Sequence, residues 1–348
     1  MSPTCTGAPV IPEFRPCPLL HNRHLMTLTV GLPRRRGLAR GDEIREIEVC
    51  ADARIRVVLD HAPDPAAPVL VLMHGLTGDA RTSYMVGVAD KARRAGLRVV
   101  RVQARGCGGT EGLAGPMFHA GLTGDLARVL EDVRRSFPAA SIHLAGFSLG
   151  ANVVLKLLGE WGRAAPVAVR SAVVVSPAID LAVCGRQLDE APSLAFYRRR
   201  FVKELVAMYR RHQRAFGQPV DEARLGRVDT MRAFDALYTA PIWGFDSVDR
   251  YYARASALPV LARVALPTLA IAARDDPLVP FDSLGPLGTV GPAITFHVTE
   301  HGGHLGFVAR RRAEWPCGGR DVDRRWAENR VIQWVVDRER RAREHGEA

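Results

Sequence analysis

Residues 141–161, SIHLAGFSLGANVVLKLLGEW, place a short apolar strand pattern before the motif G-x-S-x-G and a helical run after it. The chain must turn sharply between strand and helix, and Gly146 and Gly150 are small enough to let that turn pack closely. Such a turn presents the hydroxyl of Ser148 at the edge of a sheet. A chance match in a chain with 32 glycines is the alternative, but the flanking strand and helix argue against it.

The segments on both sides of this turn alternate between strand and helix patterns. Polar–apolar alternation at 44–50 and 55–61 favours a half-buried hairpin. A continuous apolar run at 69–73 is typical of a strand buried on both faces. Further strand patterns occur at 97–103, 141–145, 171–175, 268–272 and 294–298. Helical patterns occur at 82–95, 122–136, 149–161 and 324–344. This order predicts an α/β fold with a mostly parallel central sheet and flanking helices.

The alternation stops between residues 178 and 256, where Arg and aromatic residues are frequent and the pattern indicates helices and loops. We therefore expect a core formed by residues 41–177 and 257–348, with a helical cap inserted at 178–256. Residues 1–40 are expected to form an N-terminal arm that lies extended on the core.

The composition is typical of a globular protein, with 47% hydrophobic and 24% charged residues. The formal net charge is +11 and comes almost entirely from arginine, since lysine occurs only at positions 91, 156 and 203. The arginines are dispersed and no aromatic–basic pattern stands out, so we expect no nucleic-acid partner. A basic surface favours anionic substrates or lipid head groups.

The six cysteines lack CxxC spacing, so we expect no metal site. We also expect no organic cofactor. The N-terminus lacks the basic and apolar regions of a signal peptide, and no apolar run reaches 18 residues. We therefore expect a cytoplasmic protein with reduced thiols. The oligomeric state stays open.

A serine hydroxyl needs a base to act as a nucleophile, and eleven histidines are candidates. His304 lies in EHGGHLGF (300–307), just after the last expected strand, where two glycines give a loop that can bring an imidazole over Ser148. His301 is the alternative in the same loop. His143 and His297 fall inside expected strands, and His74 precedes the glycine loop after the first parallel strand.

The base needs a carboxylate to orient it, and the chain order Ser, Asp, His points to ARDDPLVP (273–280). We expect Asp276 to serve, since the P-L-V-P turn would fix it at the apex of the loop, while Asp275 stabilises the loop. Asp275 itself remains an alternative. Asp180 also follows a strand, but a helix N-cap is the preferred interpretation there.

The oxyanion of a tetrahedral intermediate needs backbone N–H donors. By position these are the N–H of Leu149, directly after the nucleophile, and the N–H of Leu76 in HGLTG (74–78). The glycine-rich loop at 105–110 fails the dinucleotide-binding spacing and is expected to border the site, with Cys107 as a structural thiol.

Residues 198–214, RRRFVKELVAMYRRHQR, combine an apolar stripe with a basic face. Two interpretations stand side by side: a lid that covers an acyl pocket and contacts anionic lipid, or a packed cap helix with a solvated face.

Eight segments together resemble the YheT-like branch of α/β hydrolases. They are HNRHLMTL, HGLTG, RGCGG, GFSLGANVVLK, TAPIWGF, YYARAS, ARDDPLVP and HGGHLGF, in that order. The resemblance implies the α/β-hydrolase fold and a Ser148–Asp276–His304 triad. Its eukaryotic relatives include medium-chain fatty-acid ethyl ester synthases and phospholipases. This chain departs from the pattern at Met26, where Gln is usual, and at Thr77, where an acidic residue is common.

The expected function is a serine esterase that cleaves short- to medium-chain acyl esters or lipids through an acyl-enzyme. The alternatives are an acyltransferase or lipase that works at a membrane surface, and a non-catalytic binding protein on the same fold.

Overall fold

An eight-stranded sheet forms the centre of the computed structural model, which describes residues 10–32, 41–285, 290–316 and 318–345. The strand order is β1-β2-β4-β3-β5-β6-β7-β8. The strand β2 is antiparallel to both neighbours, and every pair from β4 to β8 is parallel. The bounds are β1 (Glu43–Cys50), β2 (Ala53–Asp60), β3 (Val69–Met73), β4 (Arg98–Gln103), β5 (Ile142–Phe147), β6 (Val169–Val175), β7 (Thr268–Ala273) and β8 (Ile294–Thr299). The predicted mostly parallel sheet is confirmed.

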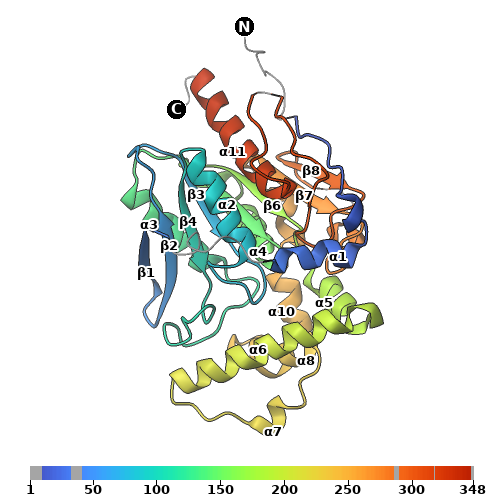
Figure 1. Cartoon of the computed structure of the whole chain (residues 1–348). Coiled ribbons are helices and arrows are strands. Elements are labelled where there is room, and N and C mark those ends of the chain that lie inside the picture. The colour runs from blue at the N-terminus through green and yellow to red at the C-terminus, as the bar shows by residue number, and fades with distance from the viewer. Residues whose placement is uncertain (1–9, 33–40, 286–289, 317, 346–348) are drawn as a thin grey trace.

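Helices cover both faces of this sheet, as Figure 1 shows. They are α2 (Ser83–Arg94), α3 (Thr123–Ser136), α4 (Leu149–Trp161) and α11 (Trp326–Glu344). Two apolar clusters result. One joins the sheet to α3 and α4 through residues such as Val129 and Val153, and the other joins it to α2 and α11 through Met85 and Val331. Burial on both faces explains why every residue of β3, β4, β5 and β7 is buried.

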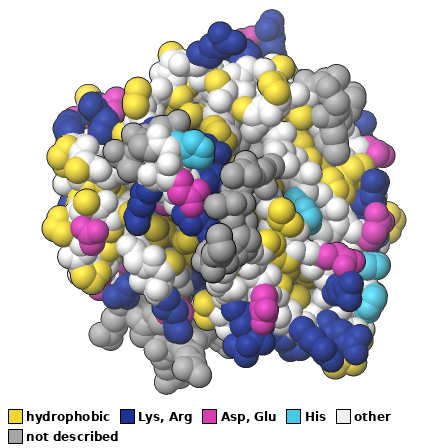
Figure 2. All heavy atoms as spheres, turned by 90° about the horizontal axis from the view of Figure 1, so that it is seen from above, with side chains coloured by type: hydrophobic (Ala, Val, Ile, Leu, Met, Phe, Trp, Pro, Cys, Tyr) yellow, Lys and Arg dark blue, Asp and Glu magenta, His cyan; other side chains and the backbone are white. Residues whose placement is uncertain are grey.

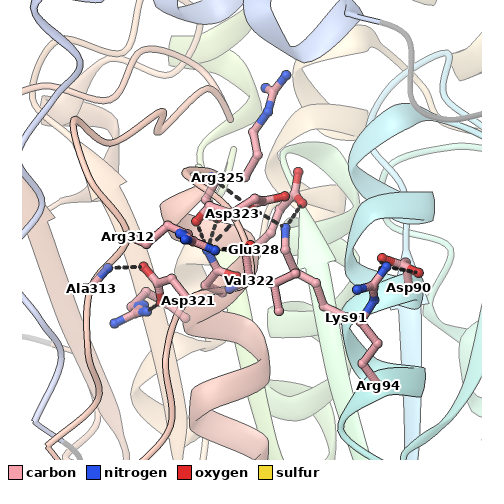
Figure 3. A network of polar contacts seen from close by, with 12 residues as sticks. Asp90, Lys91, Arg94, Arg312, Ala313, Asp321, Val322, Asp323, Arg325 and Glu328 are labelled. Carbon is pink, nitrogen blue, oxygen red and sulfur yellow. Dashed lines mark hydrogen bonds and ion pairs between the residues drawn. The ribbon is translucent and has the colours of Figure 1, made fainter.

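Buried ion pairs join α2 to α11 and to the segment just before it (Figure 3). The Lys91 side chain is only 2% exposed, and its Nζ lies 2.5 Å from Glu328 Oε2 and 3.0 Å from Asp323 Oδ1. A charge removed from water needs such partners. The contact therefore fixes the register of the two helices on this face of the sheet.

The chain between β6 and β7 is helical, and Figure 1 shows its helices together on one side of the sheet. A five-residue π-helical turn, η5, interrupts them. Their bounds are α5 (Leu181–Glu190), α6 (Ala195–Ala215), α7 (Glu222–Leu225), α8 (Met231–Phe234), η5 (Asp235–Thr239), α9 (Ala240–Ile242) and α10 (Val248–Ala255). The helices α5 to α8 and η5 share an apolar cluster that includes Leu205, Leu225 and Phe234. The helices α9 and α10 pack in a second cluster with Ala120.

The N-terminal segment contains a helix, α1 (Arg23–Leu28), so the prediction of an extended arm is wrong for these residues. The side chain of Asn22 caps α1 by accepting hydrogen bonds from the N–H groups of His24 and Leu25. Asn is a favoured N-cap residue, so the signal was present in the sequence. Residues 1–9 and 33–40 of the predicted arm lie outside the described residues.

The surface charge is dispersed on the face drawn in Figure 2, where Lys and Arg side chains lie among acidic and apolar ones. Within the described ranges, no helix combines the length and apolarity that crossing a membrane requires.

Candidate active site

Ser148 occupies the sharp turn between β5 and α4. Its φ of 53° is rare for a residue with a side chain, and such strain is typical of functional sites. A Cβ added at Gly150 would lie 2.3 Å from the carbonyl oxygen of His74, and one at Gly146 would lie 2.7 Å from Ala151 Cα. Both glycines are therefore required for the turn, and the turn exposes the serine hydroxyl at the carboxyl ends of the strands.

His304 reaches Ser148 from the loop after β8, and its Nε2 lies 2.9 Å from Ser148 Oγ. The backbone N–H of His304 donates to Thr27 Oγ1 at 2.9 Å, across 277 positions of sequence. A Cβ at the neighbouring Gly303 would lie 2.8 Å from both Thr27 Oγ1 and the carbonyl oxygen of Arg23. The helix α1 is thus packed directly against the loop that carries the imidazole.

Asp276 contacts the other side of the imidazole. Its Oδ2 and Oδ1 lie 2.9 Å and 3.1 Å from His304 Nδ1. The N–H groups of Leu278 and Val279 donate to Oδ1 at 2.9 Å and 3.0 Å, which fixes the carboxylate in place. With Nδ1–H donated to Asp276, Nε2 carries the lone pair that faces the Ser148 hydroxyl.

The residues considered as alternatives for the acid and the base hydrogen-bond to other groups. Asp275 accepts the N–H of Gly303 at 2.9 Å, and its Oδ2 lies 3.3 Å from Nδ1 of His301. The side chain of His301 is 41% exposed. Asp180 caps α5 by accepting the N–H groups at positions 182 and 183. Asp275 and His301 thus join the loops after β7 and β8, and Asp180 stabilises the start of α5. None of these contacts involves Ser148.

His74 is also accounted for by its contacts. Its Nδ1 lies 2.8 Å from the carbonyl oxygen of Gly75, and its Nε2 accepts the N–H of Ala104 at 3.1 Å. Burial lowers the pKa of His74, which keeps the ring neutral. The ring nitrogens of His74 therefore stabilise the 74–78 loop and the start of the loop after β4, and neither bonds to Ser148.

The loop at 74–78 lies against Ser148. A Cβ added at Gly75 would be 3.1 Å from Ser148 Cβ. Thr77 has a φ of 54°, and its Oγ1 donates to Glu204 Oε2 at 2.6 Å, which joins the loop to α6. Leu76 and Leu149 line the same cavity as Ser148 and His304.

Two cavities meet at Ser148. The inner chamber has a volume of about 150 Å³ and extends beneath the helices of the insertion, with walls that include Leu181, Leu188, Leu205, Met208 and Phe234. The outer groove has a volume of about 370 Å³ and opens between α1 and α6, with walls that include Leu28, Phe196, Arg200 and Glu204. Ser148, His304 and Leu76 line both, so an ester bond held at Ser148 can place one substituent in each.

The loop at 105–110 borders the inner chamber, where Cys107 lies in the wall. Gln103 Nε2 donates to the carbonyl oxygens of Cys107 and Gly108 at 2.8 Å and 3.0 Å. Burial raises the pKa of the Cys107 thiol to about 12, so a thiolate nucleophile is disfavoured there. No cluster of three or more His, Cys, Asp or Glu side chains suited to a metal ion occurs in the described part of the chain.

Sequence comparison assigns the chain to a protein family that has this fold. A family model described as alpha/beta hydrolase fold matches residues 68–310. The chain belongs to the α/β-hydrolase fold family and, within it, to the YheT-like branch of esterase/lipase-type members.

Among its relatives, "Putative esterase YheT" of Escherichia coli (strain K12) is 32% identical over 331 residues, which covers 93% of both chains. The monoacylglycerol lipase of Saccharomyces cerevisiae is 29% identical over 71% of this chain and 56% of its own length. Human phospholipase ABHD3 is 27% identical over 74% of this chain and 62% of its own length.

Solved structures share the fold at low sequence identity. Est1E from Butyrivibrio proteoclasticus, determined with ferulic acid bound, superposes with a TM-score of 0.54 at 14% identity, covering 84% of this chain and 98% of its own. The Pyrococcus furiosus esterase Pf2001 gives a TM-score of 0.54 at 16% identity, covering 88% and 97%.

Proposed function

We propose that the chain is a serine esterase in which Ser148 attacks the carbonyl of a carboxylic ester. The observation that carries this proposal is the unbroken hydrogen-bonded chain from Ser148 Oγ through the His304 imidazole to Asp276, with 2.9 Å at each link. Three segments far apart in sequence supply the three side chains. This is the arrangement that acyl transfer by a serine requires.

In the proposed reaction His304 Nε2 takes the hydroxyl proton as Ser148 Oγ attacks, and Asp276 stabilises the resulting imidazolium. The N–H groups of Leu76 and Leu149 hold the oxyanion of the tetrahedral intermediate. His304 then protonates the departing alcohol. A water molecule next attacks the acyl-enzyme, again with His304 as base, and releases the acid.

We propose that residues 178–256 form the cap of this enzyme and that the inner chamber receives the acyl chain. The chamber is mainly apolar, and a cavity of about 150 Å³ in another protein holds benzene, so about six carbons fit. The fatty-acid chemistry in the name of a yeast relative, medium-chain fatty acid ethyl ester synthase/esterase 2, supports the same range.

A series of p-nitrophenyl esters from acetate to palmitate tests this assignment. We expect kcat/KM to peak for acyl chains of about four to eight carbons and to fall for palmitate, because a longer chain cannot fit beneath the cap. Analysis of the products with and without added ethanol separates hydrolysis, which we expect, from acyl transfer. An optimum at acetate or palmitate would contradict the chamber assignment, and no turnover of any ester would favour a binding protein.

A second proposal concerns the access of lipid substrates to the outer groove. The helices α1 and α6 meet at its rim, where His24 Nδ1 lies 3.3 Å from Tyr197 Oη. Leu25, Leu28 and Phe196 are 51%, 45% and 61% exposed at this rim. The exposed Arg23 and Arg199 lie on the same two helices, whereas Arg200 pairs with Glu204 at 3.0 Å. Apolar side chains beside arginines suit an anionic lipid surface.

We expect the protein to co-sediment with phosphatidylcholine vesicles that contain phosphatidylglycerol, and to be released by high salt because the arginine contribution is screened. Replacing Leu25 and Phe196 by serine should weaken this binding. The matched control is Val167→Ser, since Val167 is 83% exposed just before β6, away from the groove. Binding that ignores lipid charge, salt and the rim variants would contradict the proposal.

A further inference from the structure

The inner chamber has a polar side chain in its apolar wall, at His119, which the proposed reaction does not use. His119 lies in the loop before α3 and is only 9% exposed. Its neighbours are aromatic: the rings of Trp243, Phe245 and Tyr251 have centroids 4.5, 5.7 and 5.9 Å from that of the imidazole. A polar group buried among apolar rings is costly unless a hydrogen-bonding partner is supplied.

The contacts of the imidazole fix which nitrogen carries the proton. The backbone N–H of Gly121 donates to His119 Nδ1 at 3.1 Å, so Nδ1 is an acceptor. Burial, followed by the charges of Arg105 and Lys156, lowers the pKa of His119 to about 4, so the ring is neutral at pH 7. In a neutral ring with an accepting Nδ1, the proton is on Nε2. His119 thus offers one N–H donor.

Among the described residues, the hydrogen bond of the imidazole is the one that Gly121 N–H donates to Nδ1, and no residue accepts from Nε2. The same loop packs next to the nucleophile: Asn152 of α4 donates to the carbonyl oxygen of Ala120 at 2.9 Å. Ala120 also belongs to an apolar cluster against which Leu149 packs. An acyl chain in the chamber therefore passes close to an unused hydrogen-bond donor.

A second polar group borders the same chamber. Asp235, the first residue of the π-helical turn, is buried and accepts the Oη–H of Tyr252 at 2.8 Å. Tyr252 follows Tyr251, whose ring lies against His119. An isolated π-helical turn often marks a functional site. Tyr252 already satisfies Asp235, so the Nε2–H of His119 is the donor in this wall that a plain hydrocarbon chain would leave unused.

We propose that His119 makes the enzyme selective for esters whose acyl chain bears an oxygen substituent, a keto or hydroxyl group that accepts a hydrogen bond from Nε2–H. This inference rests on the proposed esterase function and names its substrate class. A site built to hydrogen-bond a substrate oxygen discriminates against the analogue that lacks it, because the buried donor is then left without a partner.

The test compares p-nitrophenyl hexanoate with its 3-hydroxy, 4-oxo and 5-oxo analogues, which vary the position of the oxygen. For at least one analogue we expect the wild-type kcat/KM to exceed that for hexanoate by about tenfold. His119→Asn keeps an acceptor for Gly121 N–H but loses the longer-reaching donor, so the preference should fall to about one. His119→Gln retains a donor of similar reach and should retain most of it.

His61→Asn, the same substitution at an exposed histidine between β2 and β3, should leave the rates and the preference unchanged. The inference is overturned if wild type prefers hexanoate to every analogue, or if His119→Asn lowers all rates alike at a constant ratio, as a purely structural role would. Binding of 5-oxohexanoate, 4-oxohexanoate, 3-hydroxyhexanoate and hexanoate to Ser148→Ala, measured by calorimetry, needs no turnover. Tighter binding of at least one oxygenated acid than of hexanoate would support the inference even if the esterase proposal fails. Equal affinities for all four acids would reject it.

Discussion

Replacing Ser148 by alanine is expected to lower kcat for p-nitrophenyl butyrate by about 10⁵ to 10⁶-fold, the scale seen when a serine hydrolase loses its nucleophile. Without Oγ no acyl-enzyme forms, and His304 and Asp276 have no hydroxyl to activate. Only the oxyanion donors and substrate binding remain, and these leave a small residual rate over water. Steady-state kinetics on the purified variant measures this loss.

The matched control is Ser193→Ala, since Ser193 is exposed in a short helical turn before α6 and contacts none of the proposed catalytic side chains. Its activity should equal that of wild type. Thermal unfolding of Ser148→Ala should change little, because alanine keeps the small side chain that the turn requires. A Ser148→Ala variant that retains more than a few per cent of activity would contradict the proposed role.

Replacing Asp276 by asparagine is expected to lower kcat by about 10⁴-fold, while Asp275→Asn should cost less than about tenfold. The amide introduced at position 276 would donate to Nδ1 and so hold the imidazole in the tautomer whose Nε2 cannot accept the serine proton. At position 275 an amide oxygen can still accept the Gly303 N–H that Asp275 binds. The same substitution at two adjacent carboxylates is therefore expected to cause a large loss of kcat at position 276 and a small one at position 275.

Steady-state kinetics on the purified variants measures both losses. Circular dichroism on both variants excludes unfolding as the cause of the loss. Equal losses for Asp275→Asn and Asp276→Asn, or a larger loss at position 275, would reject Asp276 as the orienting acid.

The sheet could be predicted closely from sequence because parallel strands buried on both faces have continuous apolar runs. Val69–Met73 matches the prediction at both ends, and the predicted helix over residues 149–161 has the same bounds in the structure. The strand–turn–helix around Ser148 could be predicted for a related reason. Gly146 and Gly150 are required by close backbone contacts, and those contacts are local along the chain or lie between adjacent strands.

The support of His304 by α1 could not be predicted from sequence. The hydrogen bond from His304 N–H to Thr27 spans 277 positions, and no periodicity or spacing encodes such a contact. The capping signal at Asn22 predicts only that a helix begins there, not what it packs against.

The insertion was predictable only as a helical region. Several of its helices are short, with α7, α8 and α9 spanning three or four residues, so packing rather than local preference determines where they end. The position of His119 in the chamber wall likewise depends on aromatic residues more than a hundred positions away, such as Trp243 and Tyr251. Nothing local to the 117–121 loop distinguishes His119 from a surface histidine.

Covalent labelling of the wild-type protein with a fluorophosphonate, followed by peptide mapping, tests the nucleophile most directly. We expect one phosphonyl group per chain, carried by Oγ of Ser148, with loss of esterase activity in proportion to labelling. Unlabelled protein at full reagent excess, or a label on another side chain with Ser148 unmodified, would contradict the proposed mechanism.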